Sequence, residues 1–257
     1  NVLCSSSNGY IARFDGVNWV NLEGVRCAAT SFAVDTLGDL WMGSYGGVIH
    51  LSDTGFTKYD RWNSGIHSDI VVDMAIDKQN RKWFSTPFFR PNGHIASDIW
   101  GAVSMLDGDT WTVYGEGKWG GLLRNEQRSI AIDLNDEVWF GNRTHGLVHY
   151  DNKQTLTRYH YGPNGCEIIN CDTASEFNCE SNRDLSCSLR SFYVNDIAVD
   201  QGNYKWIGTS RGLDRLKDDV WTTFLSGVIS TIEVDNENNV WVSTSNGLFV
   251  MEQEPLI

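Results

Sequence analysis

The sequence predicts an all-β protein built from a repeated unit of short antiparallel strands, and three observations carry that prediction. An apolar alternation recurs before an Asp that is followed six positions later by a Trp. A Gly a few residues further on opens another alternating run, which is typical of half-buried strands. No segment shows a sustained period of 3.6 residues, so no long helix competes with this assignment. The five Asp and Trp pairs are Asp35 and Trp41, Asp77 and Trp83, Asp133 and Trp139, Asp200 and Trp206, and Asp235 and Trp241.

Each unit begins with the strand that ends at the Asp. The residue three positions after the Asp is always one that tolerates positive φ, which predicts a tight turn into the strand that carries the Trp. These turn residues are Gly38, Asn80, Asp136, Asn203 and Asn238.

The third and fourth strands follow from the same alignment. The runs opened by Gly predict third strands at 47–51, 101–105, 146–150, 212–216 and 247–251. Short aromatic and β-branched segments predict fourth strands at 56–59, 111–114, 156–159 and 221–224. Each unit is therefore expected to be a four-stranded antiparallel meander.

The chain also begins and ends inside the repeat. Residues 1–10 align with residues 239–248, so a sixth unit opens the chain without its first strand, and the last unit ends after its third strand. Four-stranded units repeated around an axis are the pattern of a β-propeller. We predict one domain over residues 1–257, with six four-stranded blades, or seven if the chain is truncated.

The charge balance and hydropathy exclude several partners. There are 33 acidic and 20 basic residues, a formal charge of −13, which opposes binding to nucleic acid or to an anionic membrane surface. No apolar run approaches the roughly 20 residues that span a bilayer, and residues 1–4 lack the features of a signal peptide. We expect a soluble, processed chain with no nucleic-acid partner and no membrane insertion.

The six cysteines favour disulfides and an oxidising compartment, extracellular or periplasmic. Cys4 and Cys27 could join the first unit to the next. Cys166, Cys171, Cys179 and Cys187 lie in an insertion at about 161–190 and lack the close pairs typical of zinc sites, so two disulfides of open connectivity are expected there.

The repeat resembles a known family. The pattern Asp-x-x-Gly/Asn-x-x-Trp-x-Gly/Ser-Thr/Ser-x-x-Gly-Leu is similar to the two-component regulator propeller repeat, and it covers nearly the whole chain. That resemblance implies a periplasmic sensor-type or secreted propeller that binds one of varied ligands, often glycans. The sequence has neither the transmembrane segment nor the kinase region of the sensor members, so signalling is not implied.

The insertions indicate where a ligand would bind. They lie at 61–70, 85–100, 115–128 and 161–190, in the loops that join second to third strands and successive units. We call this side the loop face, and the side of the Asp turns the turn face. Eight of the 11 Trp lie on predicted second or fourth strands and are expected to pack between blades. The other three, which could stack on a sugar ring or anchor their own loops, are Trp62, Trp100 and Trp119.

Arginines are frequent on the same face. They could hold carboxylate or sulfate groups by bidentate hydrogen bonds, or form structural bridges to Asp69, Asp98 and Glu126. The candidates are Arg61, Arg90, Arg124, Arg128, Arg143 and Arg211.

Three functions follow from these residues. The favoured one is binding of an anionic glycan or similar polar ligand. The second is a polysaccharide lyase acting on uronate polymers, with His67, His94, His145 and Tyr45 as acid and base candidates. The third is a structural or protein-docking module within a larger assembly. His50, His149 and His160 lie on strands and are expected to be structural.

No cofactor is expected, although the insertion carries acids that could supply oxygen ligands to Ca²⁺. These weaker candidates, which a solvated acidic surface also explains, are Asp172, Glu176, Glu180 and Asp184.

Overall fold

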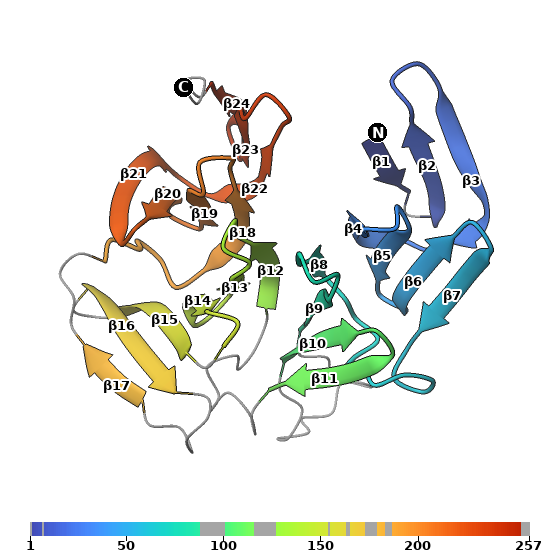
Figure 1. The fold of residues 1–257 in the computed structure, drawn as a ribbon. Coiled ribbons are helices and arrows are strands. Elements are labelled where there is room, and N and C mark those ends of the chain that lie inside the picture. The colour runs from blue at the N-terminus through green and yellow to red at the C-terminus, as the bar shows by residue number, and fades with distance from the viewer. Residues whose placement is uncertain are drawn as a thin grey trace. The chain divides into compact units, whose positions relative to one another are not determined.

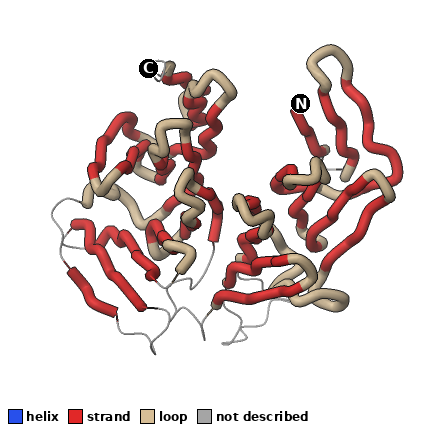
Figure 2. Tube along the Cα trace, in the orientation of Figure 1, coloured by secondary structure: helices blue, strands red, loops and turns tan. Residues whose placement is uncertain are grey.

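The all-β prediction is confirmed. The computed structural model describes residues 2–6, 8–87, 101–115, 127–153, 155–162, 165–172, 179–182 and 187–252. Within these ranges every regular element is a strand, and the sheets are antiparallel meanders in chain order (Figures 1 and 2). No described segment forms a helix long and apolar enough to cross a bilayer. The chain folds as two compact units, Asn1–Tyr114 and Gly115–Ile257.

Unit 1 contains three sheets in its described residues. The first has three strands: β1 (Val2–Ser5), β2 (Tyr10–Phe14) and β3 (Trp19–Arg26). The second has four: β4 (Ala29–Val34), β5 (Leu40–Ser44), β6 (Gly47–Ser52) and β7 (Gly55–Tyr59). The third also has four: β8 (Asp73–Ile76), β9 (Lys82–Thr86), β10 (Ala102–Asp107) and β11 (Thr110–Tyr114).

Unit 2 contains a further three sheets. The first has six strands: β12 (Gln127–Ile132), β13 (Val138–Asn142), β14 (Gly146–Tyr150), β15 (Thr155–Gly162), β16 (Gly165–Asp172) and β17 (Cys179–Asn182). The second has four: β18 (Val194–Val199), β19 (Lys205–Thr209), β20 (Gly212–Lys217) and β21 (Val220–Ser226). The third has three: β22 (Ile229–Val234), β23 (Val240–Thr244) and β24 (Gly247–Met251).

The six-stranded sheet corrects the prediction of four strands followed by a loop insertion. Residues 165–172 and 179–182 form β16 and β17, which extend the outer edge of the sheet (Figure 1). The outer edge of β15 would otherwise expose unpaired N–H and C=O groups, and the β-branched pair Ile168 and Ile169 suits a strand that satisfies them. The insertion is therefore partly an extension of the sheet.

The predicted turns are confirmed by the backbone. The residue three positions after each Asp has positive φ in all five repeats that carry the Asp and Trp pair, a conformation that Gly, Asn and Asp adopt at little cost. The φ angles are 88° at Gly38, 65° at Asn80, 67° at Asp136, 61° at Asn203 and 67° at Asn238.

One carboxylate organises each of these turns. In the turn after β12, Oδ1 of Asp133 accepts the N–H groups of Asn135 and Glu137 at 2.9 and 3.1 Å. Its other oxygen accepts the indole N–H of Trp139 at 3.3 Å. The same hydrogen bond from the indole to the Asp recurs in the other four repeats, at 3.0 Å for Trp41, 2.8 Å for Trp83, 2.8 Å for Trp206 and 2.9 Å for Trp241.

Two of these carboxylates also bind the next sheet. Lys82 on β9 lies 3.3 Å from Asp35, and Lys205 on β19 lies 3.0 Å from Asp133. The side chains of both Asp residues are at most 2% exposed. The same constellation therefore closes a turn, fixes a Trp and joins two neighbouring sheets.

Two of the eight strand tryptophans are more exposed than predicted. Trp19 is 54% exposed and Trp241 is 38% exposed, whereas the other four tryptophans on second strands are at most 3% exposed. Each lies in a sheet at one end of its unit, which has a neighbouring sheet within that unit on one side only. The Trp pattern therefore predicted the strand correctly but not its burial.

The predicted bridge between Cys4 and Cys27 is not formed, because Cys27 is a free cysteine. The β1 residue that contacts the Cys27 segment is Ser5, whose hydroxyl donates to the Cys27 carbonyl at 3.2 Å and accepts from the N–H of Ala29 at 2.9 Å. Burial raises the pKa of the Cys27 thiol, which lowers its reactivity.

Asp196 links the last two sheets of unit 2. It accepts the N–H groups of Ile197 at 2.9 Å and of Ile232 on β22 at 2.7 Å. Burial raises the pKa of Asp196 to about 6, with Glu233 adding to the rise and the two N–H groups opposing it.

Replacing Asp133 by Asn should therefore destabilise unit 2. The change leaves the Lys205 ammonium buried without its counter-charge, and the free energy of unfolding should fall by about 3 to 5 kcal/mol. Urea denaturation at neutral pH measures this loss. Asp235→Asn is the matched control, because it alters the same turn beside the exposed Trp241 and should have a smaller effect. Equal losses in the two variants would contradict the role given to the lysine.

Asp196→Asn should change how stability depends on pH. Because the folded state holds the Asp196 proton more tightly than the unfolded state, its contribution is complete below about pH 4 and is lost as pH rises through about 6. The difference in unfolding free energy between Asp196→Asn and wild type should shift in favour of the variant by about 2 kcal/mol from pH 4 to pH 7. A difference that stays constant over this range would show that Asp196 is ionised throughout.

Candidate functional site

Trp62 is the predicted stacking residue that the structure describes. It follows β7 in a turn where Asp60 accepts the Trp62 N–H at 2.9 Å, and its side chain is 81% exposed. The guanidinium carbon of Arg61 lies 4.6 Å from the Trp62 ring centroid. Nε of Arg61 lies 3.1 Å from Asp69, so the predicted bridge to Asp69 is confirmed. Trp62 is therefore not an anchor buried by its own loop.

The other predicted binding residues are only partly described. Arg128, Arg143 and Arg211 are exposed residues of unit 2, and the Arg211 guanidinium lies 5.3 Å from the ring centroid of Tyr161. Arg61 and Trp62 belong to unit 1. Four candidates lie outside the described residues: Trp100, Trp119, Arg90 and Arg124.

The lyase candidates are divided between the two units. Tyr45 is 66% exposed in the turn after β5, and the backbone N–H of His67, also in unit 1, donates to Ser104 Oγ at 3.0 Å. His145 belongs to unit 2, where its Nδ1 lies 2.7 Å from the Thr144 hydroxyl. His94 lies outside the described residues, as do Glu176, Asp184 and the side chains of Asp172 and Glu180.

Among the described residues, a cluster that was not predicted from the sequence occurs in unit 1, and a second copy occurs in unit 2. In unit 1 the ring of His50 stacks on Trp41 with centroids 4.1 Å apart, and Tyr59 stacks on the same indole at 5.9 Å. In unit 2 His149 stacks on Trp139 at 4.1 Å, and Tyr159 stacks at 6.2 Å. The two clusters occupy equivalent strands, so they are copies of one arrangement.

Each cluster pairs its histidine with an acid of the adjacent turn. His50 Nε2 lies 2.8 Å from Asp39, and His149 Nε2 lies 2.9 Å from Glu137. Burial lowers the pKa of His149 although Glu137 favours the charged ring. Burial thus favours the neutral imidazole, and His149 remains within hydrogen-bonding distance of Glu137.

Within the described ranges, Asp35, Asp39 and His50 form one group whose donor atoms lie within 4.8 Å of one another, as metal ligands would. Both Asp35 oxygens already have partners: Oδ1 accepts the N–H groups of Leu37 and Asp39 at 2.9 and 3.0 Å, and Oδ2 accepts from Trp41 at 3.0 Å and lies 3.3 Å from Lys82. The Lys82 ammonium next to this carboxylate supplies the positive charge that a metal would bring, so the group acts as a structural cluster.

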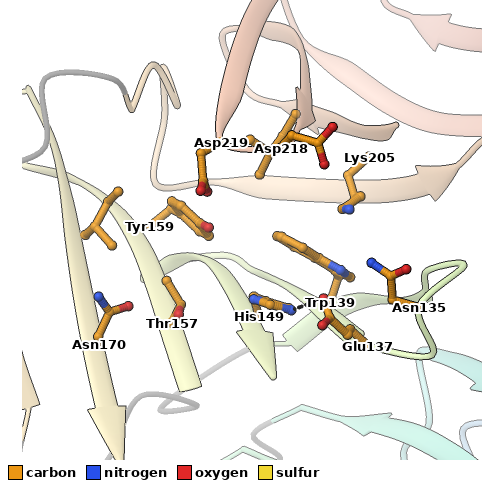
Figure 3. A pocket seen from close by; sticks show the side chains of 12 residues that line it. Asn135, Glu137, Trp139, His149, Thr157, Tyr159, Asn170, Lys205, Asp218 and Asp219 are labelled. Atoms are coloured by element: carbon orange, nitrogen blue, oxygen red, sulfur yellow. Dashed lines mark hydrogen bonds and ion pairs between the residues drawn. The ribbon is translucent and has the colours of Figure 1, made fainter. Parts of the chain in front are cut away.

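The cluster of unit 2 borders a cavity of about 420 Å³ (Figure 3). Asn135 and Glu137 lie in the turn after β12, and Asp218 and Asp219 lie in the turn after β20. Both turns belong to the turn face, at the opposite ends of the strands from Arg143 and Arg211. The cavity is therefore not on the face that the insertions indicated.

A sequence signal for this cluster exists. Lys stands directly before Trp83 and Trp206. In each case the preceding four-stranded repeat carries a His in its third strand and a Thr-x-Tyr in its fourth. Two repeats thus share the same Lys, His and Thr-x-Tyr positions, and this shared pattern distinguishes the clustered histidines from other strand histidines.

The comparisons with known proteins establish the fold. No protein-family model and no curated protein matches the sequence. Among solved structures, PorZ, a surface component of the type-IX secretion system of Porphyromonas gingivalis, matches with a TM-score of 0.60 and 15% identity over 98% of this chain. The chain spans 37% of the length of PorZ.

Two further structures match over most of their own length. A functionally unknown protein from Desulfotomaculum acetoxidans has a TM-score of 0.57 and 11% identity, covering 99% of this chain and 75% of that one. A gluconolactonase from Xanthomonas campestris has a TM-score of 0.53 and 15% identity, covering 95% and 78%. The neighbours are propeller-type proteins, and at these identities the likeness shows a propeller-type fold without an activity.

The insertion that forms β16 and β17 is held by a disulfide between Cys166 and Cys187. The backbone register also places Cys171 opposite Cys179. Directly opposed residues on antiparallel strands have Cα atoms about 4.5 to 5.5 Å apart, within the range of a disulfide.

We therefore expect a second disulfide between Cys171 and Cys179. Proteolysis without reductant, followed by mass spectrometry, should recover one peptide pair linked through Cys166 and Cys187 and another linked through Cys171 and Cys179. Cys27 is the internal control, because it should be alkylated after unfolding without reduction. Alkylation of Cys171 and Cys179 in the same experiment would contradict the second bridge.

Proposed function

We propose that the chain is a ligand-binding propeller with six blades, and that it recognises an acidic glycan or a similar polar ligand on its loop face. The observation that carries this proposal is the exposure of Trp62, at 81%, beside a guanidinium group. An indole left in water has no packing role in its own loop. A sugar ring can cover such a surface by stacking.

The arrangement around Trp62 suits an acidic sugar. Asp69 binds Nε of Arg61, which fixes the guanidinium close to the indole. A guanidinium carries five N–H donors, so one held by Nε can still offer its Nη donors to a carboxylate or sulfate group. Within unit 2, the exposed Arg211 lies in a loop between a second and a third strand, the type of loop that we assign to the loop face.

The disulfide between Cys166 and Cys187 favours a location outside the reducing cytoplasm. A secreted or periplasmic location fits the glycan hypothesis, because polymeric acidic sugars are met there. The proposal requires no cofactor.

A protein-docking role is the second candidate, and exposed apolar residues favour it. In the last sheet of unit 2, Leu248 is 65% exposed and Val250 44%, on the same strand face as the exposed Trp241 that pairs with Val250. Such a face needs a cover. In a docking module another protein would cover it.

Trp62→Ala should remove binding to uronate oligosaccharides while the melting temperature stays unchanged. Loss of a stacking Trp should weaken binding by about tenfold or more. Isothermal titration calorimetry with oligogalacturonate and with a sulfated oligosaccharide measures the affinity, and thermal unfolding measures stability. Trp19→Ala is the matched control, because it removes another exposed Trp of unit 1 from a strand.

Two results would count against glycan binding. One is wild-type protein that binds none of the acidic oligosaccharides. The other is a lower melting temperature in Trp62→Ala with unchanged affinity, which would make Trp62 a structural residue of its loop. Recovery of the protein as a stoichiometric complex with another chain would favour the docking role.

A further inference from the structure

The cavity of unit 2 has a floor that follows from strand register. Trp139, His149, Thr157 and Asn170 are successive cross-strand partners on β13, β14, β15 and β16, and all four line the cavity. Since side chains repeat every two residues on one face of a strand, Tyr159 and Ile168 form the next row on the same face. The floor thus offers aromatic, imidazole, hydroxyl and amide groups side by side.

The next sheet supplies the opposite wall. Asp218 and Asp219, in the turn between β20 and β21, lie across the cavity from His149 and Thr157 (Figure 3). Among the described residues neither carboxylate has an ion-pair or hydrogen-bonding partner. Lys205 and Leu216 complete this wall.

The insertion extends the floor of the cavity. Unit 1 has the equivalent floor row of Trp41, His50 and Thr57, but its sheet ends at β7. In unit 2 the row continues to Asn170 because β16 is added, and the disulfide at Cys166 holds β16 in place. Part of the cavity floor therefore comes from the segment that departs from the repeat.

The charges that line the cavity do not balance. Lys205 is the one cationic side chain among its described lining residues, and it is already paired with the buried Asp133 at 3.0 Å. Glu137 has a partner in His149, whose Nε2 lies 2.9 Å from its carboxylate. Asp218 and Asp219 are therefore left without a counter-charge among the described lining residues, which favours a cation over an anion.

A metal ion does not fit this arrangement. Within the described residues the three lining carboxylates do not bring their oxygens together as one group of metal ligands. Separated carboxylates above a floor of hydroxyl, amide and aromatic groups suit an extended organic cation, which needs hydrogen bonds along its length.

We propose that this cavity binds a small polar molecule that carries a protonated amine, such as a polyamine or an amino sugar. The amine would lie between Asp218 and Asp219, and the rest of the molecule would contact Thr157 and Asn170. This site is independent of the loop face, because it prefers the opposite charge and uses the other ends of the strands.

Calorimetric titration of the full chain with putrescine, glucosamine and N-acetylglucosamine tests the proposal. We expect binding of putrescine, of glucosamine, or of both, which identifies the source of the amine, and little binding of the neutral N-acetylglucosamine. The double variant D218N/D219N should weaken amine binding by about tenfold or more. Asn tolerates the φ angles of 47° and 62° at these positions, so the turn should keep its shape.

The matched control is D107N/D109N, which removes two charges from the equivalent turn of unit 1, where no strand extends the floor. It should leave amine binding unchanged. Trp62→Ala should also leave it unchanged, which separates this site from the loop face. The proposal is overturned if neither amine binds at millimolar concentration, if N-acetylglucosamine binds as tightly as glucosamine, or if D218N/D219N keeps the wild-type affinity.

Discussion

A buried carboxylate that accepts an indole N–H is the interaction on which the rest of the structure depends. In the turn after β12, one oxygen of Asp133 closes the hairpin and the other binds Trp139. Lys205 of the next sheet neutralises it. A carboxylate that lost any of these partners would be costly to bury, so turn, indole and neighbouring sheet must form together. In this repeat the turn, the indole and the packing between two sheets are thus coupled.

The same interaction prepares a site. Because Trp139 must bury its ring beside the next sheet, its cross-strand partner His149 stacks on it and turns toward an acid of the adjacent turn. The polar side chains that result lie between two sheets at the turn face. The structural motif and the cavity therefore share residues, and Trp139 both packs between sheets and forms part of the cavity floor.

What could be predicted from the sequence was what local chemistry decides. Asn80 and Asn203 marked turns correctly because positive φ is a property of one residue and its neighbours. The strand β16 was missed because its pairing depends on the outer edge of β15. The cavity was missed because His149 becomes part of it only through register with Trp139 and Thr157. The exposure of Trp62 needed the path of its loop, which spacing does not reveal.

The two copies of the cluster show how a repeat can acquire a site. Both units carry the Trp, the His, the Thr and the Lys in equivalent places, so the repeat alone supplies the floor and the charged end. What differs is the outer edge, where unit 2 adds β16 and its disulfide. A ligand that touched the shared residues alone would meet the same groups in both units. Selectivity between the copies must therefore come from the inserted strand.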